Sequence, residues 1–313
     1  MPSQKQLSEK LYKHHTTKLL ATDGISRAEQ AWRLSSCQFG AGTWLHCIPS
    51  LWHFKCGPAV FKVMLQIRLG MTIAFASDVR QCRCTFQPTT AADTEAITRG
   101  WHWMTTCPKG HRALRHNKIR DQIAAMYRSL AIHVDVEVRG LYAQLTSYGE
   151  HKPADILVPA SALPGGQAMA LDVAIADPTA KTYLDANSHR VPLKAAHKRY
   201  TDKMGTHNTA KAIAGAAGTG LQFAKLPLVF EATGAMGAET QKWWHNLVKM
   251  ATEQDGDGNP TRSRRQLGLD HTWSANDWPT YWLQRISIAH SRHQAESITQ
   301  LIGASLPTRF GLV

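Results

Sequence analysis

Short apolar runs near the middle of the chain have the length and spacing of two β-strands. The runs occupy 156–158 and 171–175, and a Pro-Gly-Gly sequence at 164–166 between them is a strong turn signal. We therefore expect a β-hairpin. If its strands pair antiparallel about a centre between positions 163 and 164, Asp155 lies opposite Asp172. Side chains alternate along a strand, so Asp172 lies on the face opposite to the apolar side chains of its own run.

Apolar residues three or four positions apart predict helices on both sides of this hairpin. Helices are expected at 58–69, 117–130, 238–253 and 276–301, in a segment that opens at 192, and once or twice within 1–36. Alternating apolar and polar residues at 132–138 predict a half-buried strand, and a short apolar run at 226–231 predicts another. Strands interleaved with helices in this order predict an α/β fold.

The chain is strongly basic and long enough for one large domain or two small ones. It has 36 Lys and Arg against 23 Asp and Glu, a formal net charge of +13, which favours a polyanionic partner such as nucleic acid. No apolar run approaches the roughly 18 residues of a membrane span, and the polar N-terminus lacks the apolar core of a signal peptide. We therefore expect an intracellular protein with no membrane partner. Its six Cys are expected to be thiols or metal ligands rather than disulfides.

Two carboxylates that face each other across a strand pair form a candidate metal site. Asp155 and Asp172 would repel each other and raise a carboxyl pKa unless a cation lies between them. Hard divalent cations such as Mg2+ prefer oxygen ligands of this type. The pair therefore suggests metal-dependent phosphodiester hydrolysis, with two solvated acids at strand ends as the alternative.

A second candidate metal site comes from thiols and imidazoles between 82 and 116. Three Cys and one His match the ligands of a structural zinc ion, and they are Cys82, Cys84, His102 and Cys107. The Cys-x-Cys spacing is tighter than the usual spacing of zinc ligands. Either His111 or His116 is an alternative to His102, and unrelated free thiols are the alternative to a metal site.

Basic residues at the start of the 117–130 helix form a candidate phosphate-binding surface. The sequence there is Arg115-His116-Asn117-Lys118-Ile119-Arg120-Asp121. Cations in a first helical turn are unfavourable for the helix dipole, so we expect them to contact a phosphate backbone. A solvated charged face is the alternative. Farther along, Lys194 and Lys198 are one helical turn apart and face the same side.

Taken in order, these motifs resemble the C-terminal region of site-specific non-LTR retrotransposon proteins. In that family a Cys-Cys-His-Cys zinc knuckle precedes a restriction-endonuclease-like domain of the PD-(D/E)xK nuclease superfamily. The matching pieces are Cys82-Arg-Cys84, His102-Trp-Met-Thr-Thr-Cys107, Arg115-His116-Asn117, Lys152-Pro-Ala-Asp155, Leu171-Asp172-Val173 and Lys198-Arg-Tyr200. Upstream, Gly40-Ala-Gly-Thr-Trp44-Leu45 and Arg68-Leu69-Gly70 resemble the segment that links the reverse transcriptase to the knuckle. The resemblance covers roughly residues 35 to 235.

The resemblance implies a restriction-endonuclease-like mixed sheet flanked by helices, with an N-terminal helical and zinc-knuckle region. It implies that Asp155 and Asp172 bind a catalytic Mg2+ or Mn2+ ion, and that Asp121 and Glu137 are further candidate acids. The family pattern usually has Pro directly before its first acid, whereas Ala154 intervenes here.

The family also uses a lysine that activates water or stabilises the transition state. The position two after Asp172 is Ala174, so the lysine is expected on the following helix, with Lys198 as the first candidate and Lys194 as the second. The residues expected to bind nucleic acid are Arg115, His116, Asn117, Lys118, Arg120, Lys152 and Tyr200.

The resemblance divides the chain into four parts. They are a helical linker region at 1–80, a zinc knuckle at 81–116, an endonuclease domain at 117–254, and a loop with a C-terminal helical extension at 255–313. No Tyr-x-Asp-Asp polymerase motif occurs, so the reverse transcriptase is not expected in this chain.

The function that follows is a metal-dependent DNA endonuclease of the target-site nicking type, acting in the nucleus. DNA is the expected partner and RNA the alternative. The competing functions are a catalytically inactive nucleic-acid-binding remnant and a resolvase-like protein that binds DNA junctions.

Overall fold

A computed structural model describes most of the chain. The described residues are 10–11, 14, 17–18, 24–73, 84, 86–107, 112–142, 154–163, 165–216, 218, 221–252, 274–275 and 277–303. Within them, no helix is both long enough and apolar enough to cross a membrane.

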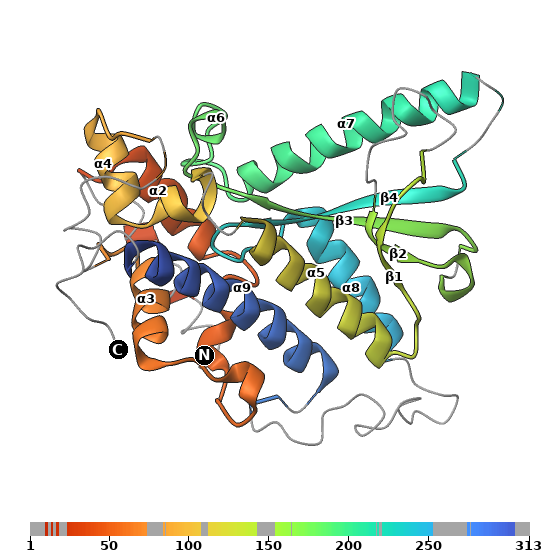
Figure 1. Ribbon diagram of the computed structural model, residues 1–313, viewed down its shortest axis with the longest axis horizontal. Coiled ribbons are helices and arrows are strands. Elements are labelled where there is room, and N and C mark those ends of the chain that lie inside the picture. Colours follow the sequence, from red (N-terminus) through yellow and green to blue (C-terminus); the bar gives the residue numbers. More distant parts are fainter. Residues whose placement is uncertain are drawn as a thin grey trace.

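Four strands form one mixed sheet in the order β1-β2-β3-β4. They are β1 (Asp135–Val138), β2 (Ala154–Val158), β3 (Ala168–Ala176) and β4 (Phe223–Glu231). The first three strands are antiparallel neighbours, whereas β4 runs parallel to β3. The expected α/β fold with a mixed sheet is confirmed (Figure 1).

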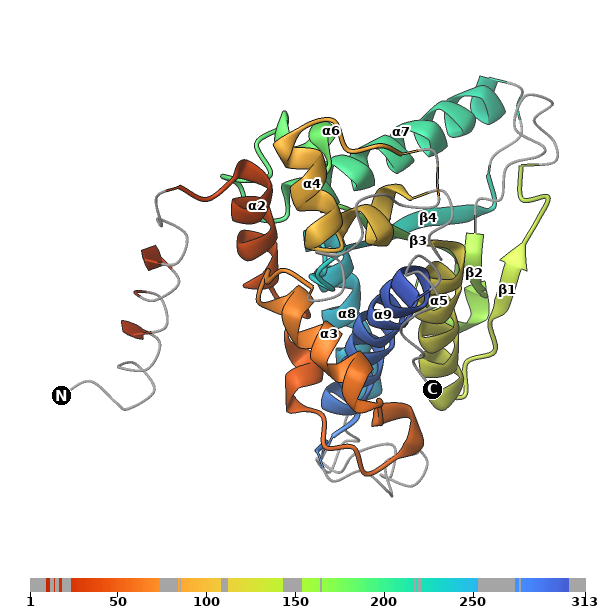
Figure 2. The ribbon, with the colours of Figure 1, turned by 60° about the vertical axis from the view of Figure 1, so that its left-hand side comes forward.

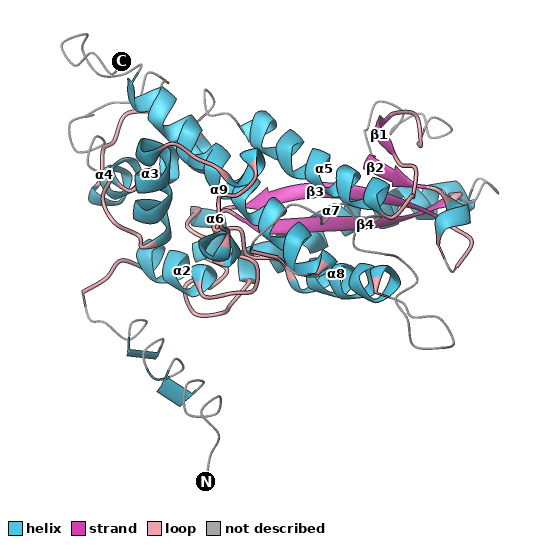
Figure 3. Cartoon of the chain, turned by 90° about the horizontal axis from the view of Figure 1, so that it is seen from below, coloured by secondary structure: helices cyan, strands magenta, loops and turns pink. Residues whose placement is uncertain are grey.

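Helices cover both faces of the sheet and form a further layer beside it. They are α2 (Arg27–Ser36), α3 (Pro58–Arg68), α4 (Ala91–Thr98), α5 (Arg112–Ser129), α6 (Lys181–Leu184), α7 (Lys194–Ala216), α8 (Ala238–Ala251) and α9 (Trp278–Gly303). Short turns of helix add η1 (Thr43–His46), η2 (Trp52–Phe54), η4 (His102–Thr106) and η5 (Ala160–Ala162). In Figure 1, α7 lies above the sheet and α5 and α8 lie below it; Figure 3 shows α5 and α9 side by side.

The pairing of β2 with β3 has the register expected from the sequence. Ile156 pairs with Leu171 and Val158 with Met169, which puts the centre of the hairpin between positions 163 and 164. One step farther along this register, Asp155 stands opposite Asp172. There the backbone pairing ends, because the amide of Val173 donates its hydrogen bond to the Asp155 side chain instead.

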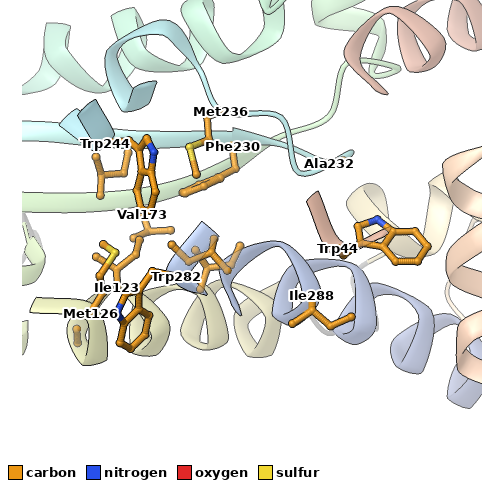
Figure 4. Close-up of a cluster of buried hydrophobic side chains, with 14 of the residues drawn as sticks. Trp44, Ile123, Met126, Val173, Phe230, Ala232, Met236, Trp244, Trp282 and Ile288 are labelled. Atoms are coloured by element: carbon orange, nitrogen blue, oxygen red, sulfur yellow. The ribbon is translucent and has the colours of Figure 1, made fainter. Parts of the chain in front are cut away.

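The two faces of the sheet bury different kinds of side chain. One face belongs to a large core that extends from Trp32 to Ile298 and contains Leu171 and Val173 of β3. Figure 4 draws Val173 facing Ile123 of α5, with Trp282 of α9 in the same cluster. The other face packs small residues under α7: Ala170, Ala174, Ala195, Ala196, Ala210 and Ala214. The sheet, the N-terminal helices and α9 therefore share one core.

The α5 helix begins earlier than apolar spacing predicts, and α7, for which only a start was predicted, is 23 residues long. The α5 helix begins at Arg112, five residues before the predicted start, because polar side chains of its first turns make internal contacts. The α7 helix continues to Ala216 because Ala210 and Ala214 pack in a small cluster with Tyr142. The helices α3, α8 and α9 agree with the prediction to within two residues at each end.

Candidate functional site

Asp172 lies between β3 and α7, and two lysines contact it. The sequence had indicated that its side chain avoids the apolar face, but it had not indicated these lysines. Its side chain is buried, with 8% of the residue exposed. Lys203 Nζ of α7 lies 2.6 Å from Asp172 Oδ1, and Lys225 Nζ of β4 lies 3.0 Å from Oδ2. Both carboxylate oxygens are therefore ion-paired, which offsets the cost of burying the charge.

Asp155 is held by a second set of partners at the start of β2. His116 Nε2 of α5 lies 3.1 Å from Oδ1, and the Val173 amide donates to Oδ2 at 2.7 Å. Burial pushes the pKa of Asp155 upward, but the His116 hydrogen bond and charge, the Val173 amide and the Lys203 charge together lower it below 3.8. The expectation that the paired acids raise each other's pKa is wrong for Asp155, because protein cations stand beside it.

Lys203 is the side chain that connects the two acids. It is bonded to Asp172, and its charge also contributes to the lowered pKa of Asp155. We name Asp155, Asp172, Lys203, Lys225 and His116 the acid cluster. It brings together residues of β2, β3, β4, α5 and α7, which are far apart in the sequence.

Neither lysine proposed from the sequence occupies this position. Lys198 lies on the outer side of α7 with its Nζ 3.5 Å from Asp202 Oδ1, and Lys194 is the first residue of the helix. Lys203 was missed although a signal existed. It shares the helical phase of the buried α7 residues Ala196, His207, Ala210 and Ala214.

Lys225 was missed because its position depends on the parallel pairing of β4. It pairs with Ala170 and therefore projects from the same side of the sheet as Asp172. Beyond it lies His207, whose Nδ1 is 2.7 Å from the hydroxyl of the buried Tyr142. Burial, followed by the charges of Lys225 and Lys211, lowers the pKa of His207, so this ring is neutral at pH 7. The Lys225 charge thus acts on the Tyr142–His207 pair as well as on Asp172.

The further candidate acids, Asp121 and Glu137, lie together at Arg120. Arg120 bonds Asp121 at 2.8 Å through one terminal nitrogen and Glu137 through the other. The Arg120 side chain is largely buried, whereas the side chains of both acids are about half exposed. Arg120 thus joins α5 to β1 rather than standing free for a phosphate.

The other expected nucleic-acid-binding residues differ in exposure. Arg115 is buried and donates to the Met104 carbonyl, while Asn117 and Lys118 are partly exposed. Tyr200 packs partly buried against the alanines under α7. Lys152 lies outside the described residues.

Three of the four expected zinc ligands come together. The ligand atoms of Cys84, His102 and Cys107 all lie within 4.8 Å of one another, and Cys84 Sγ is 3.3 Å from His102 Nε2. We name these three residues the thiol cluster. Cys82 and the alternative ligand His111 lie outside the described residues, and the other alternative, His116, contacts Asp155.

Local packing shapes the thiol cluster. The single π-helical turn η4 separates His102 from Cys107, whose amide donates to the His102 carbonyl at 2.8 Å. Phe86 stacks on the His102 ring at a centroid distance of 4.3 Å, and its amide donates to Cys84 Sγ. Burial lowers the pKa of His102, which favours the neutral imidazole that a metal requires.

Comparison with known proteins adds no family assignment. No family model matches the sequence, and neither does a curated protein. Function is therefore inferred from the geometry of the described residues.

Proposed function

We propose that the acid cluster cleaves phosphodiester bonds in DNA with the help of a divalent metal ion. The observation that carries the proposal is the position of Asp155 and Asp172 on neighbouring strands, with Lys203 close to both. This arrangement is the one expected of a restriction-endonuclease-like fold. The net charge of +13 supports a polyanionic substrate.

The donor set fits a hard cation. The lowered pKa keeps Asp155 ionised at neutral pH, and a carboxylate oxygen that accepts one hydrogen bond still has a lone pair for a metal. Asp155 and Asp172 would hold Mg2+ or Mn2+, which when bound supplies a Lewis acid and an activated water.

The chain's own residues supply positioning and positive charge. The Val173 amide and His116 fix the orientation of the Asp155 carboxylate from two sides. Lys203 and Lys225 are cations already held beside the acids, where they can attract a phosphate and stabilise the charge that develops on it during cleavage. Burial strengthens both effects because the local dielectric is low.

The decisive experiment measures nicking of supercoiled plasmid in Mg2+ by the wild type and by the Asp155→Ala, Asp172→Ala double variant. We expect the double variant to lose activity by at least about 100-fold, because without these two carboxylates the site would not hold the metal ion that stabilises the transition-state charge. A double variant that nicks as fast as the wild type would exclude this site. Circular dichroism checks that the variant is folded.

A second candidate function is nucleic-acid binding without cleavage. It is favoured by the observation that both Asp172 oxygens already have lysine partners, so the cluster is satisfied without a metal. In this case the wild type binds DNA equally well with Mg2+ or EDTA and nicks no plasmid. Preference for branched over linear DNA would identify the junction-binding alternative.

We further propose that the thiol cluster binds a structural zinc ion, with Cys82 as the fourth ligand. Two thiols and a neutral imidazole in close proximity match the ligand types of such sites. Zinc would link η4 to Cys84, which precedes α4 in the chain. Its place directly before α5 suggests a role in presenting that helix, which contributes His116, to the acid cluster. Action in the nucleus remains a prediction.

A further inference from the structure

Trp52 is unlike the other tryptophans of the described chain. It is 75% exposed, whereas the other described tryptophans are all buried: Trp32, Trp44, Trp101, Trp103, Trp243, Trp244, Trp278 and Trp282. An exposed indole offers a partner a large, flat apolar face together with a hydrogen-bond donor. The exposure of this one ring therefore points to a binding role.

The residues next to Trp52 anchor η2 to α9. In η2, Phe54 is buried in the core while Trp52 projects outward, with its ring edge-on to His53 at 5.4 Å. His53 is fixed in turn, since its Nε2 lies 3.3 Å from the hydroxyl of Tyr281 on α9. Arg292 of α9 donates to the carbonyl of Lys55 at 3.1 Å. The backbone that carries Trp52 is therefore anchored to α9 on the C-terminal side of the ring.

The surface near Trp52 in the sequence is aromatic and basic. No Asp or Glu occurs from 30 to 77, and the exposed residues on this stretch include His46, Lys55 and Lys62. An acid of the adjacent α9, Glu296, is paired with His293 at 2.8 Å. Positive charge beside an exposed indole matches a phosphate chain that carries unpaired bases.

We infer that single-stranded nucleic acid binds this surface by stacking a base on Trp52, with its phosphates near Lys55 and Lys62. Every base has a flat π-face, so such stacking is tolerant of sequence. The bases of a duplex are already stacked and paired, which makes a single strand the better partner. The cations argue against an uncharged protein surface as the occupant.

This surface is separate from the acid cluster. The segment that contains η2 leads into α3 and packs on α9, whereas Asp172 faces α7 on the far side of the sheet. Figures 1 and 2 show the segment before α3 at the lower end of the molecule and α7 at the upper end. The inference therefore stands whether or not the acid cluster cleaves DNA.

Binding of fluorescein-labelled dT20 and U20, followed by anisotropy at fixed salt, tests the inference. Stacking of one base predicts that Trp52→Ala weakens binding by about 5- to 100-fold and that Trp52→Phe retains most of the affinity. Leu69→Ala is the matched control, because Leu69 is also exposed, at 62%, and should not affect binding. The two oligonucleotides distinguish DNA from RNA as the partner.

A second measurement separates stacking from general charge. Lys55→Gln should make the dependence of affinity on salt shallower by roughly one released counterion, while Trp52→Ala should leave that slope unchanged. Tryptophan emission that is quenched by dT20 in the wild type should lose that component in Trp52→Ala.

Unchanged affinity of Trp52→Ala for both oligonucleotides would overturn the inference. If the same variant instead lost self-association in sedimentation, Trp52 would belong to a contact with a second copy of the chain. Equal weakening by Leu69→Ala would also overturn it, because the effect would then be general to exposed apolar residues.

Discussion

The acid cluster and the thiol cluster differ in the kind of ligand atoms that they gather and in the charges beside those atoms. In the acid cluster, the oxygens of Asp155 and Asp172 contact an amide, an imidazole and two lysines. The thiol cluster gathers two sulfurs and a buried imidazole nitrogen within 4.8 Å, with the Phe86 amide on one sulfur. Protein cations already neutralise the acids of the first cluster, whereas we propose that a metal ion supplies the main stabilisation of the second.

This difference separates the roles of the two clusters. An acid cluster that is stable without a metal can bind and release Mg2+ while the fold stays intact. If the thiol cluster holds zinc as we propose, zinc binding is linked to folding. The following predictions test the comparison.

The largest expected effect is that of zinc removal on folding. Cys107→Ser replaces a fully buried ligand, and we expect it to lower bound zinc and to reduce the free energy of unfolding by about 3 kcal/mol or more. Urea denaturation and metal analysis measure the two effects. The exposed Cys37 provides the control, since Cys37→Ser should change neither quantity. Zinc-free protein of undiminished stability would contradict the role of the thiol cluster.

Loss of Lys203 is expected to affect catalysis more than folding. Lys203→Ala should slow plasmid nicking by about 100- to 1,000-fold, which is typical for loss of one charge-stabilising group. Lys198→Ala is the matched control on the same helix, because Lys198 pairs with Asp202 on the outer side. If Lys198→Ala proved the more damaging change, the assignment made from the sequence would be restored.

Lys225 provides a test of whether Mg2+ and lysine can substitute for each other. Lys225→Ala leaves the buried Asp172 with one cation, and we expect about 1–3 kcal/mol of destabilisation in EDTA. Millimolar Mg2+ should restore part of this loss by binding the folded state, yet change the wild type little. Urea denaturation with and without Mg2+ measures this. Equal effects of Mg2+ on both proteins would argue against binding at Asp172.

The smallest expected effect concerns pH. The pKa of Asp155 is lowered in the folded protein, so its ionised form adds stability above the ordinary value of 3.8. That contribution is lost as pH falls through the folded pKa. Asp155→Asn should therefore be less stable than the wild type by about 1 kcal/mol at pH 6, and the difference should shrink below about pH 4. If the stability difference between the two proteins grew as the pH fell, the pKa of Asp155 would be raised in the folded protein rather than lowered.

Sequence patterns were informative where local periodicity decides the structure. The turn signal at 164–166 and the alternation around it predicted the hairpin register, and the number and type of the ligands between 82 and 107 predicted that Cys84, His102 and Cys107 come together. In both cases the residues concerned are close in sequence or paired through one turn. Such contacts follow from local geometry.

The cations of the acid cluster depend on packing between distant segments. Lys203 reaches Asp172 because of the way α7 is turned about its own axis. Small alanines between α7 and the sheet allow that orientation. Lys225 reaches Asp172 because β4 pairs parallel with β3. Arg115 is buried where it donates a hydrogen bond to the Met104 carbonyl. Strand neighbours cannot be deduced from one local run of residues, and the helical phase of Lys203 becomes informative only once the buried side of α7 is known. Position 174, two after Asp172, is Ala, and the lysines that contact Asp172 come from α7 and β4.

The end of backbone pairing at Asp155 gives the acid cluster a built-in spectroscopic reporter. The amide proton of Val173 is bonded to a carboxylate rather than to a strand carbonyl. Its chemical shift and its rate of hydrogen exchange therefore depend on the charge and the ligands of that carboxylate. Titration of Mg2+ into 15N-labelled protein would then report occupancy of the site through a single backbone resonance, independently of any cleavage assay.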